Sequence, residues 1–183
     1  RKDWNGLISG FKASDLVFLD ESGCNTDMTR RYAYSLGGSR AVDSAPLSKP
    51  KNTTILSSIQ LDGTLRYTTF SGGTTVERFK RYLETDLLPH LNGNSVLIKD
   101  NMKSHHAKAV RNLLDSSGVR YIYLPPYSPD LNPIEKLWSK VKAFLRKFKA
   151  RTLDALPNAI QNAFHAVTIS DCSGWFRFCG YAL

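Results

Sequence analysis

The sequence predicts an α/β fold in which a mixed sheet is flanked by helices. Two strand-like segments joined by the tight turn Asp62-Gly63 indicate a β-hairpin, and therefore antiparallel pairing. After this hairpin, segments with helical spacing alternate with short apolar runs, which is typical of parallel strands connected by helices. A sheet that contains both kinds of pairing is mixed.

The first 70 residues are predicted to contain strands and a loop. Residues 16–19 are a short apolar run and predict a buried strand. Residues 30–36 alternate loosely and predict a second strand, whereas residues 40–52 contain two prolines and predict a loop. Residues 53–61 and 64–70 are the expected strands of the hairpin.

In the second part, helices and strands alternate. Thr74 and Glu77 have the spacing of a capping box, which predicts that a helix begins there. Asn132 is expected to cap a long helix whose first residue is Pro133. In order, we expect a helix over residues 74–87, a strand over 96–98, a helix over 107–117, a strand over 119–124, the long helix over 133–148, a helix over 153–167, and an aromatic tail that packs back on the domain.

The charge of the chain favours a polyanionic partner. Lys and Arg number 25 against 16 Asp and Glu, which gives a net charge of +9. This balance favours nucleic acid over a membrane, although an ordinary basic protein is the alternative. No apolar run approaches the roughly 18 residues of a membrane span, so no membrane partner is expected. The three cysteines contain no C-x-x-C pair, which fits buried thiols better than a zinc site or disulfides.

Three acids have positions that suit a metal site. Asp20 and Asp100 each end a predicted strand, and the carboxyl ends of parallel strands collect ligand-binding groups. Glu135 lies in the first turn of the long helix. Carboxylates are the oxygen ligands that Mg²⁺ prefers, and two such ions about 3.5–4 Å apart can activate water and stabilise the leaving oxygen of a phosphodiester. Taken singly, each acid also has an ordinary structural explanation in a turn, a loop or a helix cap.

The segment 124–138, with the sequence LPPYSPDLNPIEKLW, resembles the third-acid segment of the mariner-like bacterial insertion-sequence transposases, a branch of the DDE superfamily. Asp20-Glu21-Ser22-Gly23 resembles the first-acid segment of that group. Asp100-Asn101 followed by His105 resembles the second, and the 34 residues between Asp100 and Glu135 are a typical spacing. The chain ending, with Trp175-Phe176 and Cys179-Gly180-Tyr181, extends the resemblance from about residue 15 to the end.

The resemblance implies a ribonuclease-H-like fold and two divalent ions, Mg²⁺ or Mn²⁺, bound by Asp20, Asp100 and Glu135. It implies cleavage at transposon ends and transfer of a 3′ hydroxyl into target DNA, typically at TA steps. The expected partners are transposon ends, target DNA and a second copy of the chain in a homodimer. The expected location is the bacterial cytoplasm, with the nucleoid as the site of DNA binding. Asn101 and His105 are candidate supports of the site, with a capping or solvent-facing role as the alternative for His105.

The sequence departs from the family pattern at its N-terminus and at Lys99, and each departure leads to a structural expectation. Members normally begin with a helix-turn-helix module, so the polar residues 1–14 are expected to be a linker from a missing N-terminal segment, and residues 15–183 the DDE catalytic domain. Lys99 stands where an apolar strand residue is usual, and it is expected either to help hold phosphate or to face outward. Glu21 is expected to point to the face opposite Asp20, because side chains alternate along a strand.

Two other functions use parts of the same pattern. A ribonuclease-H-like nuclease without strand transfer needs the three acids but neither terminal repeats nor a dimer. An inactive DNA-binding remnant of a transposase needs only the basic surface. The proline-rich segment argues against the first, and the presence of all three acids argues against the second.

The long helix predicts where DNA lies. Residues 136–151 include seven Lys and Arg and no acid. At about 100° per residue, Ser139, Lys142 and Arg146 fall within about 40° of Glu135, which predicts a DNA-binding strip that leads away from the acids. A solvated basic face is the alternative. Of two nearby aromatic residues that could stack on bases, Tyr127 is left open and Trp138 is expected in the core.

Overall fold

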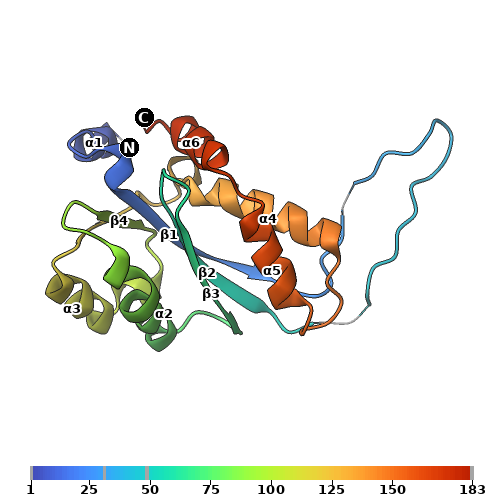
Figure 1. Ribbon diagram of the computed structural model, residues 1–183, viewed down its shortest axis with the longest axis horizontal. Coiled ribbons are helices and arrows are strands. Elements are labelled where there is room, and N and C mark those ends of the chain that lie inside the picture. The colour runs from blue at the N-terminus through green and yellow to red at the C-terminus, as the bar shows by residue number, and fades with distance from the viewer. Residues whose placement is uncertain (1, 31, 48–49, 182–183) are drawn as a thin grey trace.

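The structure, a computed structural model, describes residues 2–30, 32–47 and 50–181 (Figure 1). A π turn over Leu83–Leu87 extends the second helix. The helices and strands are α1 (Lys2–Ile8), β1 (Leu16–Cys24), β2 (Thr53–Ile59), β3 (Leu65–Ser71), α2 (Val76–Tyr82), β4 (Val96–Lys99), α3 (Lys108–Ser117), β5 (Arg120–Tyr123), α4 (Ile134–Phe148), α5 (Leu156–His165) and α6 (Ile169–Phe178).

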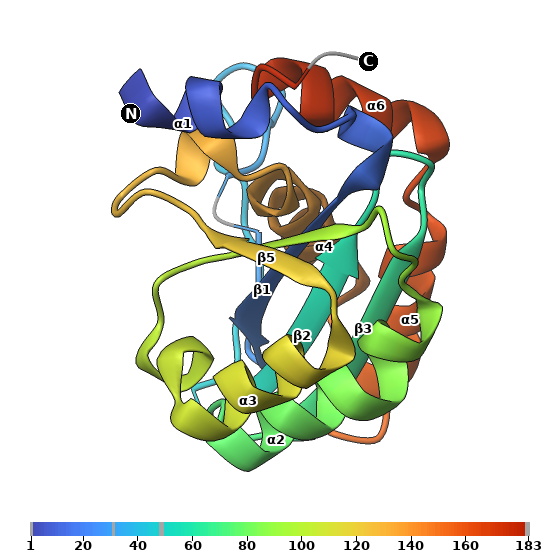
Figure 2. The ribbon, with the colours of Figure 1, turned by 90° about the vertical axis from the view of Figure 1, so that its left-hand side faces the viewer.

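The five strands form one mixed sheet in the order β3-β2-β1-β4-β5 (Figure 2). The pairs β1–β2 and β2–β3 are antiparallel, and the pairs β1–β4 and β4–β5 are parallel. The hairpin between β2 and β3 turns at Gly63, whose φ of 89° suits a residue without a Cβ. The parallel strands are connected through helices, as parallel pairing requires. The predicted mixed sheet flanked by helices is confirmed.

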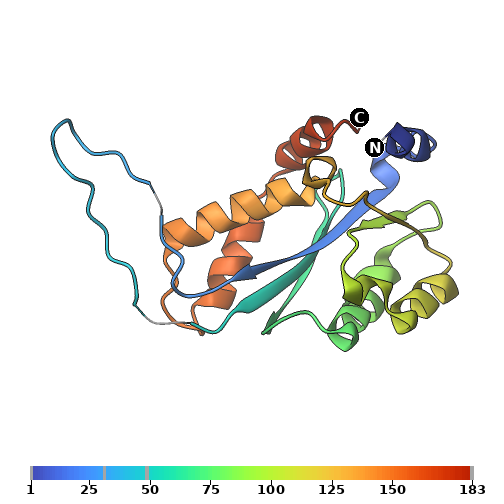
Figure 3. The same cartoon turned by 180° about the vertical axis from the view of Figure 1, so that it is seen from behind.

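Helices cover both faces of the sheet, so that two cores form. Figure 3 shows α4, α5 and α6 on one side and α2 and α3 on the other. Side chains alternate along β1, so Phe18 belongs to the first core and Leu19 to the second. The aromatic tail forms α6 and packs back on the domain as expected, with the rings of Phe18 and Phe176 5.3 Å apart.

Several local predictions differ from the structure. The described residues among 30–36 form no strand and belong to the long loop between β1 and β2, which extends away from the domain (Figure 1). The end of α4 tethers this loop, since Lys149 Nζ lies 2.6 Å from Asp43 Oδ1. Helix α2 begins one residue later than predicted, because Thr75 rather than Thr74 accepts the hydrogen bond from the N–H of Arg78.

The N-terminal residues are more ordered than a linker. The described part of residues 1–14 contains α1, and Trp4 is 4% exposed within the core on the α4 side. Burial of an indole explains why this short helix stays on the domain. The division of the chain at residue 15 remains a prediction. Among the described helices, none has both the length and the apolar composition to cross a membrane.

Candidate active site

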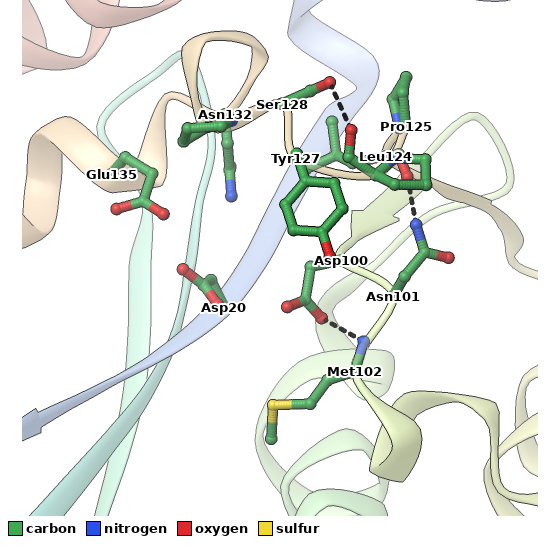
Figure 4. Close-up of a pocket in the computed structure, with 12 residues that line it drawn as sticks. Asp20, Asp100, Asn101, Met102, Leu124, Pro125, Tyr127, Ser128, Asn132 and Glu135 are labelled. Atoms are coloured by element: carbon green, nitrogen blue, oxygen red, sulfur yellow. Dashed lines mark hydrogen bonds between the residues drawn. The ribbon is translucent and has the colours of Figure 1, made fainter.

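A cavity of about 420 Å³ opens at the edge of the sheet where β4 ends. Figure 4 shows Asp20 and Glu135 on one side of it and Asp100 and Asn101 on the other. These four residues come from β1, α4 and the segment that follows β4. The structure thus brings the three predicted acids to one cavity, and their catalytic roles remain predictions. The lining consists of Asp20, Asp100, Asn101, Met102, Leu124, Pro125, Pro126, Tyr127, Ser128, Pro129, Asn132 and Glu135.

Strand pairing explains why the first two acids meet. Leu19 pairs with Lys99 across the parallel strands β1 and β4, so the residues that follow them, Asp20 and Asp100, lie level. The prediction that Asp20 ends its strand is wrong. Strand β1 continues to Cys24, because its antiparallel partner β2 pairs with it as far as Cys24. Asp20 therefore lies within β1 and pairs with Ser57 of β2, just beyond the last residue that pairs with β4.

Asp20 is the most perturbed acid of the cavity. It is 9% exposed, and the indole N–H of Trp138 donates a hydrogen bond of 3.0 Å to its Oδ2. Burial raises the pKa of Asp20 to about 7, and the nearby charges of Glu135 and Glu21 add to the effect, although hydrogen bonds oppose it. Burial, more than repulsion between acids, thus makes this carboxylate poorly suited to carry a charge without a cation. Trp138 lies in the core, as expected, and also orients Asp20.

The donor set suits a hard divalent cation. All three acids offer carboxylate oxygens, and the raised pKa of Asp20 marks a place where a positive charge would be favourable. Among the residues the structure describes, no three His, Cys, Asp or Glu side chains lie close enough to hold one ion together. The expectation that Asp20, Asp100 and Glu135 bind one or two ions between them stays a prediction. Mg²⁺ needs only one or two carboxylates with water completing the shell, so the residues present fit it.

His105 links Asp100 to an acid on the other side of the sheet. Its Nδ1 lies 2.6 Å from Asp100 Oδ1, and its Nε2 lies 3.2 Å from Glu21 Oε2. Its ring also stacks on Phe79 of α2 at 4.1 Å, and its side chain is fully buried. Glu21 does point away from Asp20, as predicted, and alternation along β1 brings it to His105. The partnership of Glu21 and His105 was not predicted, since 83 residues separate them in the sequence.

The charges of this trio stabilise one another. Burial opposes a charged imidazole, but Asp100 and Glu21 outweigh it and raise the pKa of His105 to about 9. Burial would likewise raise the pKa of Asp100, but the contact with His105 and the hydrogen bond from the N–H of Met102 lower it below its usual value. At neutral pH, His105 is thus a cation between two carboxylates. It is well placed to fix the orientation of Asp100.

Lys99 has neither of the two predicted positions, because it is completely buried on the α2 and α3 side of the sheet. Its Nζ donates a hydrogen bond of 3.1 Å to the carbonyl of His105 and lies 4.9 and 4.7 Å from the ring centres of Tyr121 and Tyr123. The hydroxyl of Tyr123 donates to the same carbonyl at 3.0 Å. Burial lowers the pKa of Lys99 to about 8. Lys99 therefore helps to fix the turn that carries His105, at a cost in desolvation.

We expect Lys99→Met to raise the free energy of unfolding by about 2 kcal/mol at pH 6.5, because it removes a buried charge and keeps the volume of the side chain. The carbonyl of His105 keeps its hydrogen bond from Tyr123. Since the lowered pKa penalises the charged lysine, the gain should shrink as the pH rises from about 8 toward 10.5. Urea denaturation at pH 6.5 and 9.5 measures both values. A loss of stability at pH 6.5 would show that the lysine contacts outweigh desolvation.

Asn101 supports the cavity wall. Its Nδ2 donates a hydrogen bond of 2.6 Å to the carbonyl of Leu124, and its Oδ1 lies 3.2 Å from Nε2 of His106. The ring of His106 stacks on Tyr123 at 4.1 Å. Asn101 therefore joins the segment after β4 to the start of the proline-rich segment. Both ends of its amide are engaged in this way, which favours a structural role for Asn101 in supporting the site.

The proline-rich segment differs from the prediction at the start of α4. Pro133, and not Asn132, is the cap residue of α4, and no side chain caps this helix. Asn132 lines the cavity instead, is 4% exposed, and has a buried Oδ1 without a hydrogen-bond partner. Tyr127 is 99% exposed at the same cavity. Neither position follows from sequence spacing, because each depends on how the segment folds over the end of β4.

Two of the basic residues in and just after α4 are paired with carboxylates, and two others are not. Lys140 pairs with Asp171 at 2.5 Å, and Lys149 pairs with Asp43. Lys142 and Arg146, from the predicted strip, make no ion pair among the described residues, and both line a second, polar cavity of about 450 Å³. Ser139, the third residue of the strip, is exposed. The structure thus separates the cations that carboxylates already hold from those that remain available to an anion.

Comparisons with known proteins agree with this arrangement. A family model described as DDE superfamily endonuclease matches residues 15–157. The transposable element Tc1 transposase of Caenorhabditis elegans is 31% identical over 97 residues, which covers 51% of this chain and 36% of that protein. The pre-cleavage Mos1 transpososome gives a TM-score of 0.79 at 19% identity, covering 96% of this chain and 55% of that chain. The Mos1 mariner paired-end complex with Mn gives 0.78 at 21% identity, covering 96% and 54%.

This chain spans about a third of the length of the Tc1 transposase and about half of the Mos1 chains. The structural likeness covers 96% of this chain. It confirms the predicted ribonuclease-H-like fold, a mixed sheet flanked by helices.

Proposed function

This chain belongs to the DDE superfamily endonucleases, and from that premise we propose that it cleaves DNA at transposon ends and transfers the cut strand into target DNA. One observation carries the proposal: the carboxylates of Asp20, Asp100 and Glu135, which come from three separate segments, line one cavity. All three residues lie within residues 15–157, the part of the chain that the family model matches. Two Mg²⁺ or Mn²⁺ ions held by these acids would supply Lewis-acid stabilisation of the leaving oxygen and a more acidic bound water. The Mos1 complex with Mn supports this choice of metal.

The residues of this chain would fix the geometry of the reaction. Trp138 orients Asp20 through its indole N–H, while His105 and the N–H of Met102 hold Asp100. Preset ligands avoid reorganisation at the moment of reaction. In the first step the oxygen of water bonds to phosphorus, the bond from phosphorus to the 3′ oxygen breaks, and a proton passes to that oxygen. In the second step the oxygen of the free 3′ hydroxyl bonds to a phosphorus of the target, the bond from that phosphorus to the target's own 3′ oxygen breaks, and the hydroxyl proton is given up while the released 3′ oxygen takes up a proton.

The test is a cleavage assay on duplex DNA that carries the repeats flanking the gene. We expect cleavage with Mg²⁺ or Mn²⁺ and none in EDTA. Asp20→Asn, Asp100→Asn and Glu135→Gln should each lower the rate about a thousandfold or more, as removal of a catalytic group does. Glu84→Gln is the matched control, since Glu84 is a surface residue paired with Lys80. Cleavage in EDTA, or full activity in all three variants, would refute the proposal.

The same assay separates the alternatives. Cut ends that never join a target would indicate a nuclease without strand transfer. Binding without any cleavage would indicate an inactive DNA-binding remnant. Fusion of this chain to any upstream coding segment should be compared in parallel, because this chain covers only part of the length of its relatives.

We also expect Lys142 and Arg146 to bind DNA phosphates, because both line one polar cavity and neither is ion-paired within the described residues. Changing both to Ala should weaken DNA binding without regard to sequence and reduce the slope of log K against log salt by about two. The matched control is Lys140→Ala with Lys149→Ala, which removes two charges of the same helix region that Asp171 and Asp43 already pair. Equal slopes in the two double variants would contradict this placement.

The oligomeric state, source, location and domain division of the protein also remain proposals. A homodimer in the active complex is supported by the Mos1 structure, which is a paired-end complex. The Tc1 relative is a nematode protein, so it gives no support to a bacterial insertion sequence as the source. The bacterial origin and the cytoplasmic, nucleoid-associated location therefore stay predictions, as does the division into a linker over 1–14 and a catalytic domain over 15–183.

A further inference from the structure

Glu21 is a mostly buried acid that lies outside the cavity of the three acids. It pairs with Leu56 across β1 and β2, on the α2 side of the sheet, and its side chain is 12% exposed. Its Oε2 lies 3.2 Å from Nε2 of His105, whereas its Oε1 is buried without a hydrogen-bond partner among the described residues. A carboxylate with one unsatisfied oxygen stabilises an apolar core poorly. The contribution of Glu21 to the protein therefore lies in its bond to His105.

The ring of His105 is held in its plane by contacts that do not involve Glu21. The carbonyl of His105 accepts two hydrogen bonds, and its ring stacks on Phe79 with 25° between the two ring planes. These contacts do not decide which edge of the ring faces Asp100, because χ2 of histidine is roughly two-fold and a half-turn about it keeps the plane of the ring. The half-turn would move Nδ1 away from Asp100 and Nε2 away from Glu21 at once. Glu21 thus favours the edge-on orientation in which Nδ1 meets Asp100.

The two carboxylate oxygens of Asp100 have different surroundings. Oδ1 lies 2.6 Å from Nδ1 of His105 and accepts a hydrogen bond of 3.0 Å from the N–H of Met102 (Figure 4). Oδ2 has neither a hydrogen bond nor an ion pair with the residues that the structure describes, and the side chain is 41% exposed where it lines the cavity. Because the protein holds Oδ1, the carboxylate keeps Oδ2 available to a cation. The orientation of the His105 ring therefore controls how Asp100 presents its free oxygen.

We propose that Glu21 is a positioning residue for metal binding, which holds the ring of His105 from the far face of the sheet in the orientation that fixes Asp100 as a ligand of a divalent cation. The inference rests on the proposed function, because that function assigns Asp100 to the metal. Consecutive residues of β1 then serve one site from the two faces of the sheet, Asp20 at the cavity and Glu21 through His105. Loss of a group that orients a metal ligand weakens metal binding by about ten- to a hundredfold.

Two substitutions of Glu21 separate the reach of its side chain from its charge. Glu21→Gln keeps the length of the side chain, so its amide still reaches Nε2 of His105, but the charge is removed. Glu21→Asp keeps the charge but is one methylene shorter, so it loses the contact of 3.2 Å. Binding of Mn²⁺ is measured by electron paramagnetic resonance on the chain without DNA. We expect Glu21→Asp to weaken Mn²⁺ binding about tenfold and Glu21→Gln to stay within about threefold of the wild type.

The matched control is Leu56→Val, which disturbs the same core directly opposite Glu21 and cannot bond to His105. This variant should lower the thermal stability because it removes a buried methylene, yet it should bind Mn²⁺ as the wild type does. Asp100→Asn should weaken Mn²⁺ binding at least as much as Glu21→Asp. If Leu56→Val or Glu21→Gln loses as much affinity as Glu21→Asp, general loosening of the core or loss of charge explains the effect and the proposal is wrong.

The ring of His105 gives a second readout that requires no metal. In protein labelled with ¹⁵N-histidine, the ring N–H signals of His105 are identified by their loss in His105→Leu. They should exchange slowly with water in the wild type and in Glu21→Gln, and faster in Glu21→Asp. Unchanged exchange, or equal Mn²⁺ binding by Glu21→Asp and the wild type, would overturn this inference and leave the proposed function intact. Failure of the wild type to bind Mn²⁺ would overturn the inference, and failure to cut DNA as well would overturn the proposed function with it.

Discussion

Asp20→Asn is expected to raise the free energy of unfolding of the metal-free protein at pH 8, by up to about 4 kcal/mol. The carboxyl has a pKa of about 7 in the folded state against its ordinary value of 3.8, and each pKa unit corresponds to about 1.4 kcal/mol. Because the folded pKa is raised, the penalty is absent below pH 4, grows between pH 4 and 7, and is complete above pH 7. Asparagine removes the charge and can still accept the hydrogen bond from Trp138.

Urea denaturation at pH 4.5 and pH 8, in EDTA, measures this gain. The control is Asp100→Asn, which makes the same chemical change but should destabilise the protein at pH 8. The pKa of Asp100 is lowered, so the charge of this carboxylate stabilises the folded state. Its removal leaves the imidazolium of His105 without one of its two carboxylate partners. Equal effects of the two variants would contradict the assignment of opposite environments to the two acids.

Binding of Mg²⁺ or Mn²⁺ should make the wild type more stable than Asp20→Asn, the reverse of the order in EDTA. An ion that binds only the folded state stabilises it by RT ln(1 + [L]/Kd), which is about 2.7 kcal/mol at a hundredfold excess over Kd. Mg²⁺ or Mn²⁺ should therefore stabilise the wild type and have little effect on Asp20→Asn. An equal thermal shift for both proteins would mean that the ion binds without Asp20.

His105→Leu is expected to lower the free energy of unfolding by about 3 kcal/mol at pH 7. His105 is the only charged partner between Glu21 and Asp100 among the described ion pairs, and its removal leaves a mostly buried Glu21 uncompensated. The pKa of His105 in the folded state, about 9, lies above the ordinary histidine value of 6.5. The stabilisation is thus fully present below pH 6.5 and lost as the pH rises through 9.

The measurement is the pH dependence of urea denaturation between pH 6 and 9.5 for wild type and variant. The wild type should lose stability across this range more steeply than His105→Leu, which lacks the titrating imidazole. The double variant His105→Leu/Glu21→Leu should recover much of the loss, because it removes the stranded carboxylate as well. If the single variant is as stable as wild type at pH 7, His105 does not act as a buried cation.

Local patterns predicted the fold well where they were strong and failed where tertiary contacts decided the outcome. The hairpin at Asp62-Gly63 and the helix of residues 108–117 follow from turn chemistry and from apolar spacing, which act over a few residues. The loose alternation of residues 30–36 predicted a strand, but the described residues there find no strand to pair with. Asn132 has the sequence of a helix cap, yet the turn over Pro129–Leu131 places its side chain in the cavity.

The sequence by itself determined the identity and order of the three acids, the mixed sheet, and the basic character of α4. These properties depend on residue type, spacing and a resemblance carried by contiguous segments. The tertiary structure decided which charges are paired. It set Asp20 in the middle of a strand beneath Trp138, joined Glu21 to Asp100 through His105, and buried Lys99 on the far side of the sheet. These outcomes depend on burial and on contacts between distant segments, and electrostatic energies depend on the local environment more than on sequence distance.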